Sequence, residues 1–140
     1  MEKEISTCGA VIFDDNNNVL LVEHLPGAHN LTGKFGLPAG HVEDGEASSE
    51  AVVRELFEET GIKLNKGTFK RLPTVYHADI EQKDGVQHML WEVFTAQVEN
   101  CALRESEETR PMWVRLEEAR DLNLLPNVLE AIREAELLRV

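Results

Sequence analysis

The stretch that decides the fold is GHVEDGEASSEAVVRELFEETGI, residues 40–62. It begins with a loop segment that contains two glycines and several acids, and it continues into a run whose apolar side chains recur at helical spacing. We expect a helix over Ser48–Thr60, with Ser48 or Ser49 capping its start and Gly61 in the left-handed conformation that ends it. The stretch therefore predicts a loop, a helix and a terminating turn in succession.

Three carboxylates share one face of this expected helix. At about 100° per residue, Glu55, Glu58 and Glu59 point to the same side. The opposite side carries four apolar residues that we expect to pack on a sheet: Val52, Val53, Leu56 and Phe57. Like charges at these spacings repel each other, and a divalent cation relieves that cost. Carboxylate oxygens are ligands that Mg²⁺ prefers, while a solvated acidic face is the alternative that the helix alone leaves open.

Strand-like runs lie on both sides of the loop and helix. Ile5–Phe13 and Val19–Val22 are apolar and rich in β-branched residues, and the polar cluster between them predicts a hairpin. Three further runs are strand-like: Gly67–His77, Gln87–Val98 and Met112–Val114. Strands before and after one helix predict an α/β fold, with a mixed β-sheet sandwiched between helices.

Loops and short helical segments complete the expected order. Leu25–Gly36 contains a proline and several glycines and predicts a long loop, and Asp84-Gly85 predicts a turn between two strands. Leu116–Leu122 is expected to form a helical turn, and Pro126 suits the first turn of a final helix. Three residues of that last helix are expected on one side: Val128, Ile132 and Ala135.

The composition limits the class of protein. With 140 residues, 42% of them hydrophobic and 29% charged, the chain is expected to form one domain over residues 1–140. No apolar stretch approaches the roughly 20 residues of a membrane helix, and Met1–Ile5 lacks the start of a secretory signal. We therefore expect a cytoplasmic protein with no membrane partner. Cys8 and Cys101 lack metal-ligand spacing, and we expect buried thiols rather than a disulfide.

The net charge of −12 argues against nucleic acid as a partner, because its backbone is bound by accumulated Lys and Arg. It does not argue against a nucleotide substrate. An acidic pocket binds phosphate when divalent metal ions lie between the two.

The spacing within residues 40–62 resembles the Nudix box at every defined position. The matching residues, in order, are Gly40, Glu46, Arg54-Glu55-Leu56, Glu58-Glu59 and Gly61-Ile62. A motif of this length is far more specific than a lone glycine fingerprint. The chain thus resembles the MutT-like Nudix hydrolases, and its expected strand order is similar to the Nudix fold over nearly its whole length.

The resemblance implies how these residues act. The glutamates that match Glu55, Glu58 and Glu59 bind Mg²⁺, or in some members Mn²⁺, and the carbonyl of Gly40 joins them. Glu55 is our first choice to orient or deprotonate the attacking water. The resemblance implies that Arg54 orients the glutamates by ion pairing.

Two more acids have implied roles outside this set. Glu46 is expected to support the loop, with direct metal contact as the alternative. Residues 105–113 resemble the equivalent stretch in hydrolases of oxidised purine nucleoside triphosphates, and that alignment makes Glu108 a further metal ligand. For Glu105 and Glu107 we expect solvated loop acids.

Two residues are candidates for contact with substrate. The oxidised-purine hydrolases carry Trp-Pro-Asp-Asp where this chain has Leu125-Pro126-Asn127-Val128, so the aromatic side chain and both acids are missing. Asn127 keeps an amide that can bond a base edge, or it serves as an ordinary helix-start residue. Phe35 stands where many relatives carry Trp, either as a base platform or as core packing. We assign no role to His77 or His88.

The resemblance implies a Mg²⁺-dependent pyrophosphohydrolase that cleaves a diphosphate linkage in a nucleoside diphosphate derivative, foremost a nucleoside triphosphate or modified nucleotide. Nucleotide sugars and ADP-ribose are the alternative substrates. A Nudix module that senses a nucleotide without cleaving it is the second alternative. Such modules lose box glutamates, whereas this chain keeps them all. We expect a monomer or a homodimer.

Overall fold

A mixed β-sheet forms the centre of the molecule in the computed structural model, which describes residues 3–26, 31–82 and 85–139. Within these residues the sheet has seven strands, in the order β3-β2-β1-β6-β5, with β4 beside β1 and β7 beside β2. The strands are β1 Lys3–Phe13, β2 Asn18–His24, β3 Phe35–Gly36, β4 Ala39–His41, β5 Lys70–Gln82, β6 Gly85–Gln97 and β7 Thr109–Arg115. The helices are α1 Ser48–Thr60, α2 Leu116–Ala119 and α3 Val128–Leu137, with a 3₁₀ turn, η2, at Lys66–Thr68.

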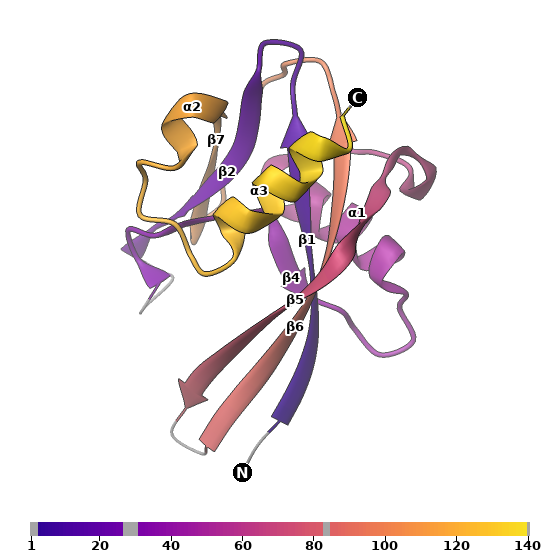
Figure 1. Cartoon of the computed structure of the whole chain (residues 1–140), viewed down its shortest axis with the longest axis vertical. Helices are drawn as coiled ribbons and strands as arrows, with labels where there is room; N and C mark the ends of the chain where they lie inside the picture. Colours follow the sequence, from indigo (N-terminus) through magenta and orange to yellow (C-terminus); the bar gives the residue numbers. More distant parts are fainter. Residues whose placement is uncertain (1–2, 27–30, 83–84, 140) are drawn as a thin grey trace.

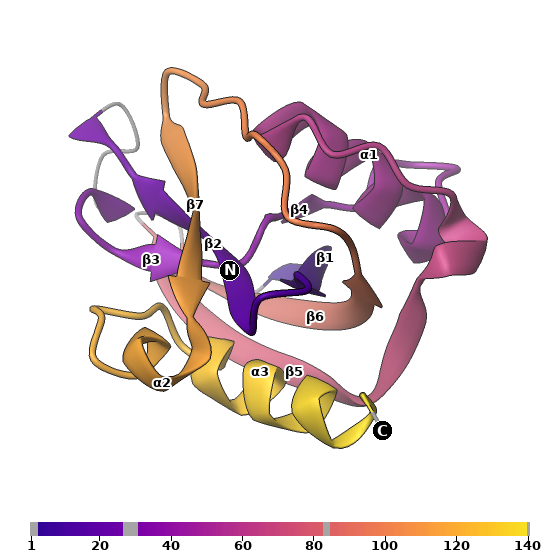
Figure 2. The same cartoon turned by 90° about the horizontal axis from the view of Figure 1, so that it is seen from above.

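Helices cover both faces of the sheet, with α1 on one side and α2 and α3 on the other (Figures 1 and 2). Alternate residues of β1 point to opposite faces, as the period of a strand requires. Val11 and Phe13 therefore join the buried cluster that includes Ile132 of α3, and Ile12 joins the cluster that includes Leu56 of α1. The expected mixed sheet between helices is confirmed.

The central strand β1 has different neighbours along its two edges. It runs parallel to β6 over its whole length, from the Lys3–Gln87 pair to the Phe13–Gln97 pair. On its other edge it pairs with β4 at Thr7–Gly9, and with β2 only at Phe13. The start of the box at β4 therefore lies beside the middle of β1. One end of β1, β5 and β6 extends beyond the helices as a three-stranded arm (Figure 1).

The hairpin between β1 and β2 is confirmed, and Asp14 shapes its turn. This buried carboxylate accepts hydrogen bonds from the backbone N–H groups of Asn16 and Asn18, both at 2.9 Å. The side-chain amides of Asn18 and Asn100 donate to it at 2.8 and 2.7 Å. These donors offset the cost of burying the charge.

The helix expected over Ser48–Thr60 is confirmed, but its expected cap is wrong. Ala47 occupies the N-cap position, and its N–H donates to the Glu50 carboxylate at 2.9 Å. Ser48 Oγ instead donates to Glu92 on β6 at 2.8 Å, so this hydroxyl ties the helix start to the sheet. Gly61 adopts the expected left-handed conformation, with φ of 83°.

Two expectations about burial are wrong. Phe57 is 41% exposed, with the Arg104 guanidinium 4.9 Å from its ring centroid, so the apolar face of α1 is narrower than expected. Cys101 is exposed in the loop before β7, whereas Cys8 is buried as expected, and both are free thiols. Cys101 lies in the loop that follows β6, which ends at Gln97.

Several strands and helices begin or end at residues other than those predicted from the sequence. The run predicted from Gly67 begins with the turn η2 and becomes strand β5 at Lys70, and the long loop ends in the short strand β3. Pro126 precedes the last helix rather than starting it, because Asn127, with φ of 70°, is the residue before the first helical turn. The buried side of that helix is as expected: Val128, Ile132 and Ala135.

Some expectations lie outside the described residues. Asp84, the first residue of the expected turn, and residues 27–30 of the expected loop are among them. In the part of the chain that is described, no helix is long and apolar enough to cross a membrane.

Candidate active site

Arg54 joins the loop of the box to the helix. Its Nε lies 2.9 Å from Glu46 Oε2 and its Nη1 lies 2.8 Å from Glu55 Oε1, while Nη2 donates to the carbonyl of His41 at 3.1 Å. The hydrogen bond from Arg54, helped by the N–H of Glu43, lowers the pKa of Glu46 to about 2. The loop-supporting contact expected of Glu46 is therefore present, as is the ion pairing expected of Arg54.

Gly40 and Glu55 occupy adjoining space. A Cβ on Gly40 would lie 2.1 Å from Glu55 Cδ, which is well inside any contact distance. Because Gly40 has no side chain, the Glu55 carboxylate can occupy this space. Burial raises the pKa of Glu55, and the neighbouring Arg54 opposes that rise only in part.

Glu59 is the most strongly perturbed acid of the helix. Its Oε1 accepts the N–H of Ala39 at 2.7 Å. Burial, with the added charges of Glu55, Glu58 and Glu108, nevertheless raises its pKa to about 8. The charge of Glu108 thus acts on Glu59 although the two lie far apart in sequence. The structure brings the four predicted acids into one electrostatic neighbourhood.

The arrangement fits a divalent ion in its chemistry. Within residues 3–26, 31–82 and 85–139, no three acidic, His or Cys side chains converge closely enough to hold an ion as they stand. Arg54 engages Glu55, and the Ala39 N–H engages Glu59. Burial is the main cause of the raised pKa values of these two acids, and neighbouring carboxylates add to it. Oxygen ligands of this kind suit Mg²⁺.

The loop before β7 brings Glu108 to this region. Its carbonyl accepts the N–H of Leu25 at 2.8 Å, and the next residue, Thr109, pairs with His24 at the end of β2. Glu108 therefore lies beside the end of β2, while its side chain stays exposed. Glu105 and Glu107 are exposed too, as expected of loop acids.

The four acids Glu55, Glu58, Glu59 and Glu108 are called the acidic cluster below. A cavity of about 150 Å³ lies beside this cluster and is lined by Glu59. Gly40 and Glu59 line one end of it. Its other walls are mostly apolar and come from β1, β2, β4, β6 and the neighbouring loops: Thr7, His24, Leu31, Leu37, Ala39, His41, Met89, Trp91 and Leu125. The apolar part of the cavity had no signal in the helix motif, because its residues come from segments far apart in sequence.

Neither Phe35 nor Asn127 is among the residues that line this cavity. The backbone of Phe35 bonds to Asn123 and Leu125, which fixes the loop before α3. The side-chain amide of Asn127 donates to the carbonyl of His77 at 2.9 Å. Asn127 thus holds the helix start against β5, and its substrate role and that of Phe35 stay predictions.

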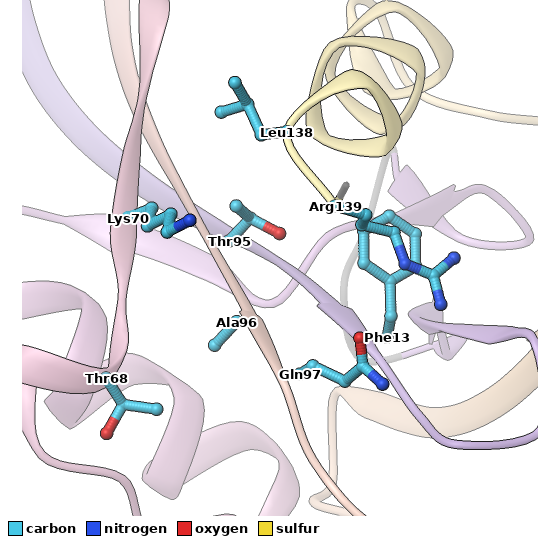
Figure 3. Close-up of a pocket in the computed structure, with 8 residues that line it drawn as sticks. All are labelled: Phe13, Thr68, Lys70, Thr95, Ala96, Gln97, Leu138 and Arg139. Carbon is cyan, nitrogen blue, oxygen red and sulfur yellow. The ribbon is translucent and has the colours of Figure 1, made fainter.

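A second cavity, of about 180 Å³, lies at the other end of β1 and β6 (Figure 3). Its lining residues include Phe13, Lys70 and Gln97, and the Arg139 guanidinium lies 4.2 Å from the Phe13 ring centroid. No residue of the box lines it. The candidate active site is therefore the cavity at Gly40 and Glu59.

Similarity to known proteins identifies the family of this chain. The NUDIX domain model matches residues 3–135, and the chain belongs to the Nudix family. It is 34% identical over 117 residues to an ADP-ribose pyrophosphatase of Methanocaldococcus jannaschii, covering 84% of this chain and 62% of that protein. It is 36% identical over 76 residues to an 8-oxo-dGTP diphosphatase of Proteus vulgaris, covering 54% of this chain and 65% of that protein. The chain thus spans less than two thirds of the length of these relatives.

A third relative is matched nearly end to end. The asymmetrical bis(5'-nucleosyl)-tetraphosphatase of Mus musculus is 30% identical, with 93% of this chain and 92% of that protein covered. Among solved structures, the MutT NUDIX hydrolase of Burkholderia pseudomallei has a TM-score of 0.77 at 27% identity, with 94% of this chain and 98% of that chain covered. The NUDIX domain of Shewanella oneidensis NrtR, complexed with ADP ribose, has a TM-score of 0.79 at 22% identity, with 100% and 91% covered. The expected Nudix fold is confirmed.

Proposed function

We propose that this chain is a pyrophosphohydrolase that depends on Mg²⁺ or Mn²⁺ and cleaves the diphosphate linkage of a nucleoside diphosphate derivative. The observation that carries the proposal is the position of Glu55 against Gly40, together with Glu59, which lines a mostly apolar cavity beside Gly40. An anionic diphosphate needs a cation at such an acidic end, and the apolar remainder suits an organic group.

The residues that would hold the metal are Glu55, Glu58, Glu59 and Glu108, together with the carbonyl of Gly40. A divalent ion bound there would neutralise the diphosphate and make a bound water more acidic. The Nudix relatives are named as diphosphatases and pyrophosphatases, which supports the same reaction class.

Glu55 is the acid we propose to orient or deprotonate the attacking water. Its carboxylate sits against Gly40 and lies 2.8 Å from Arg54 Nη1, so its position is fixed for orienting a water. Arg54 is then a positioning residue, because its contacts at 2.8 and 2.9 Å hold Glu55 and Glu46 in fixed places. Glu46 completes that support from the loop.

For the substrate we propose a nucleoside triphosphate or a modified nucleotide first. ADP-ribose and nucleotide sugars are the alternatives, and the names of the relatives include both an 8-oxo-dGTP and an ADP-ribose enzyme. A nucleotide-sensing module remains the second alternative. The chain keeps all the box glutamates, which favours catalysis over sensing.

A substrate panel tests the proposal. Nucleoside triphosphates, oxidised nucleotides, nucleotide sugars, ADP-ribose and dinucleoside polyphosphates are incubated with the protein, with and without Mg²⁺. We expect release of a nucleoside monophosphate, plus pyrophosphate or a phosphorylated second product, only when Mg²⁺ is present. Binding of one compound without cleavage of any would contradict the proposal and support the sensor.

A further inference from the structure

The cavity at Gly40 and Glu59 has both polar and apolar lining residues. Glu59 and the backbone of Gly40 form the polar end, and Met89, Trp91 and Leu125 lie among the apolar walls. A ligand whose charged group reaches Glu59 through a cation must therefore place an uncharged group against these walls. Trp91 offers the largest flat surface among the described residues that line the cavity.

Small residues fix the position of the Trp91 indole. Trp91 lies on β6 beside Thr7 of β1. A Cβ on Gly9 would lie 3.5 Å from both Cε3 and Cζ3 of the indole, and 3.7 Å from the Cβ of Ala39. The six-membered ring thus faces Gly9 of β1, next to the strand that begins the box. An aromatic group held in this way gives a rigid contact surface at little cost in conformational entropy.

The opposite rim of the cavity depends on Gly36. A Cβ at this position would lie 3.0 Å from Leu125 Cδ1 and 3.4 Å from His24 Cε1. The ring of His24 is itself fixed, because its Nδ1 lies 2.9 Å from the carbonyl of Lys34. The glycine therefore lets His24 and Leu125 approach each other and close one side of the cavity.

On the basis of the proposed function, we infer that Trp91 is the platform on which the substrate's base stacks, with the diphosphate directed toward Gly40 and Glu59. The apolar walls suit a planar base better than a sugar, whose hydroxyls need hydrogen-bonding partners. The hydroxyl of Thr7, a polar group on the wall, already donates to the carbonyl of Leu90 at 2.8 Å. The volume of about 150 Å³ is small for a whole ligand site and suits one ring system.

Tryptophan fluorescence tests this inference by binding alone. The sequence has two tryptophans, so Trp113→Phe leaves Trp91 as the single reporter. Trp113 packs with the cluster on the α1 face of the sheet and is not among the residues lining the cavity. This variant is titrated with AMP, GMP, CMP and UMP, and with ribose 5-phosphate as the control without a base, each in the presence of Mg²⁺.

We expect at least one nucleoside monophosphate to quench the fluorescence with saturation, and ribose 5-phosphate to leave it unchanged. The matched variant Trp91→Phe, which keeps Trp113, should show no saturable change with any of the compounds. Equal quenching by ribose 5-phosphate, or no quenching by any of the four nucleotides, would overturn the inference.

Kinetics provide a second, separable readout. Trp91→Leu should raise KM for the best nucleotide substrate roughly ten- to hundred-fold, since stacking of a base on an aromatic side chain is lost, with a smaller effect on kcat. Trp91→Phe should restore most of the affinity, which a general folding defect would not allow. If the wild type is active and Trp91→Leu leaves KM unchanged, the platform is wrong while the proposed function stands. If the wild type cleaves nothing, the proposed function fails and the fluorescence titration still decides the platform.

Discussion

Gly40 and Glu55 show how a single missing side chain can define a site. The box motif marks both positions, but only the structure reveals that the Glu55 carboxylate fills the place of a Cβ on Gly40. Trp91 likewise lies beside Gly9 of another strand, a neighbour that no local pattern indicates. The sequence could predict the acids from their helical spacing. It could not predict the cavity walls, because these form only when distant strands pair.

Gly40→Ala tests this packing. The added methyl must displace the Glu55 carboxylate, and a displacement of about 1 Å in a catalytic group can lower the rate roughly a hundred-fold. We therefore expect a fall in kcat of about that size, measured under saturating substrate and Mg²⁺. Gly67→Ala is the matched control, because its Cβ would meet nothing within 4 Å. Equal activity of the two variants would refute the packing argument.

Arg54→Lys tests the positioning role. Lysine keeps the charge but cannot reproduce the planar fork that bonds Glu46 and Glu55 together. We expect activity or metal affinity to fall about 10- to 100-fold, as is typical for residues that support metal ligands. The readouts are kcat and a Mn²⁺ titration followed by electron paramagnetic resonance. Arg133→Lys, at an exposed position on α3, should change neither.

At the scale of elements, periodic segments were predicted well and their ends less so. The apolar spacing located α1, and Gly61 marked its end correctly. The cap was missed because Ser48 bonds to Glu92 on β6, a partner that lies 44 residues away. Phe57 was misplaced for a related reason, since the exposed side of α1 carries a stacked Arg104 rather than sheet. Local patterns contain no information about such distant partners.

Asp14, in the turn between β1 and β2, leads to a prediction about how the stability of the protein depends on pH. Burial favours a raised pKa for Asp14, but hydrogen bonds from Asn100, Asn18 and Asn16 outweigh it and lower the pKa. A lowered folded-state pKa stabilises the protein above the unfolded pKa of about 3.9, and this contribution is lost as pH falls through the folded value. Asp14→Asn should thus reduce the free energy of unfolding by about 1–3 kcal/mol at pH 7, and by less at pH 3.

Urea unfolding at the two pH values measures this difference. Asp44→Asn, at an exposed position in the box loop, serves as the control and should behave like the wild type at both. A loss of stability at Asp14→Asn that is equal at pH 7 and pH 3 would contradict the linkage.

For the whole molecule, the order of strands and helices could be predicted because one specific motif anchored it.

Because the net charge is −12, any added salt screens the repulsion between the acids, and a test of specific Mg²⁺ binding needs a control for this effect. Mg²⁺ bound at the acidic cluster stabilises the folded state by mass action, about 2.7 kcal/mol at one hundred times Kd. We expect millimolar MgCl₂ to raise Tm in thermal unfolding beyond the rise caused by KCl of equal ionic strength, which reports screening alone. Equal rises with the two salts would mean that no specific site is filled.

The most direct test of the central claim is the Mg²⁺-dependent turnover of Glu58→Gln against that of Glu50→Gln. Both glutamates lie on α1, but Glu58 belongs to the acidic cluster, whereas Glu50 caps the helix start by accepting the Ala47 N–H. With the best substrate of the panel, Glu58→Gln should lose turnover while keeping the wild-type Tm without metal, and Glu50→Gln should keep its turnover. Hydrolysis by Glu58→Gln at the wild-type rate would contradict the assignment of the metal site.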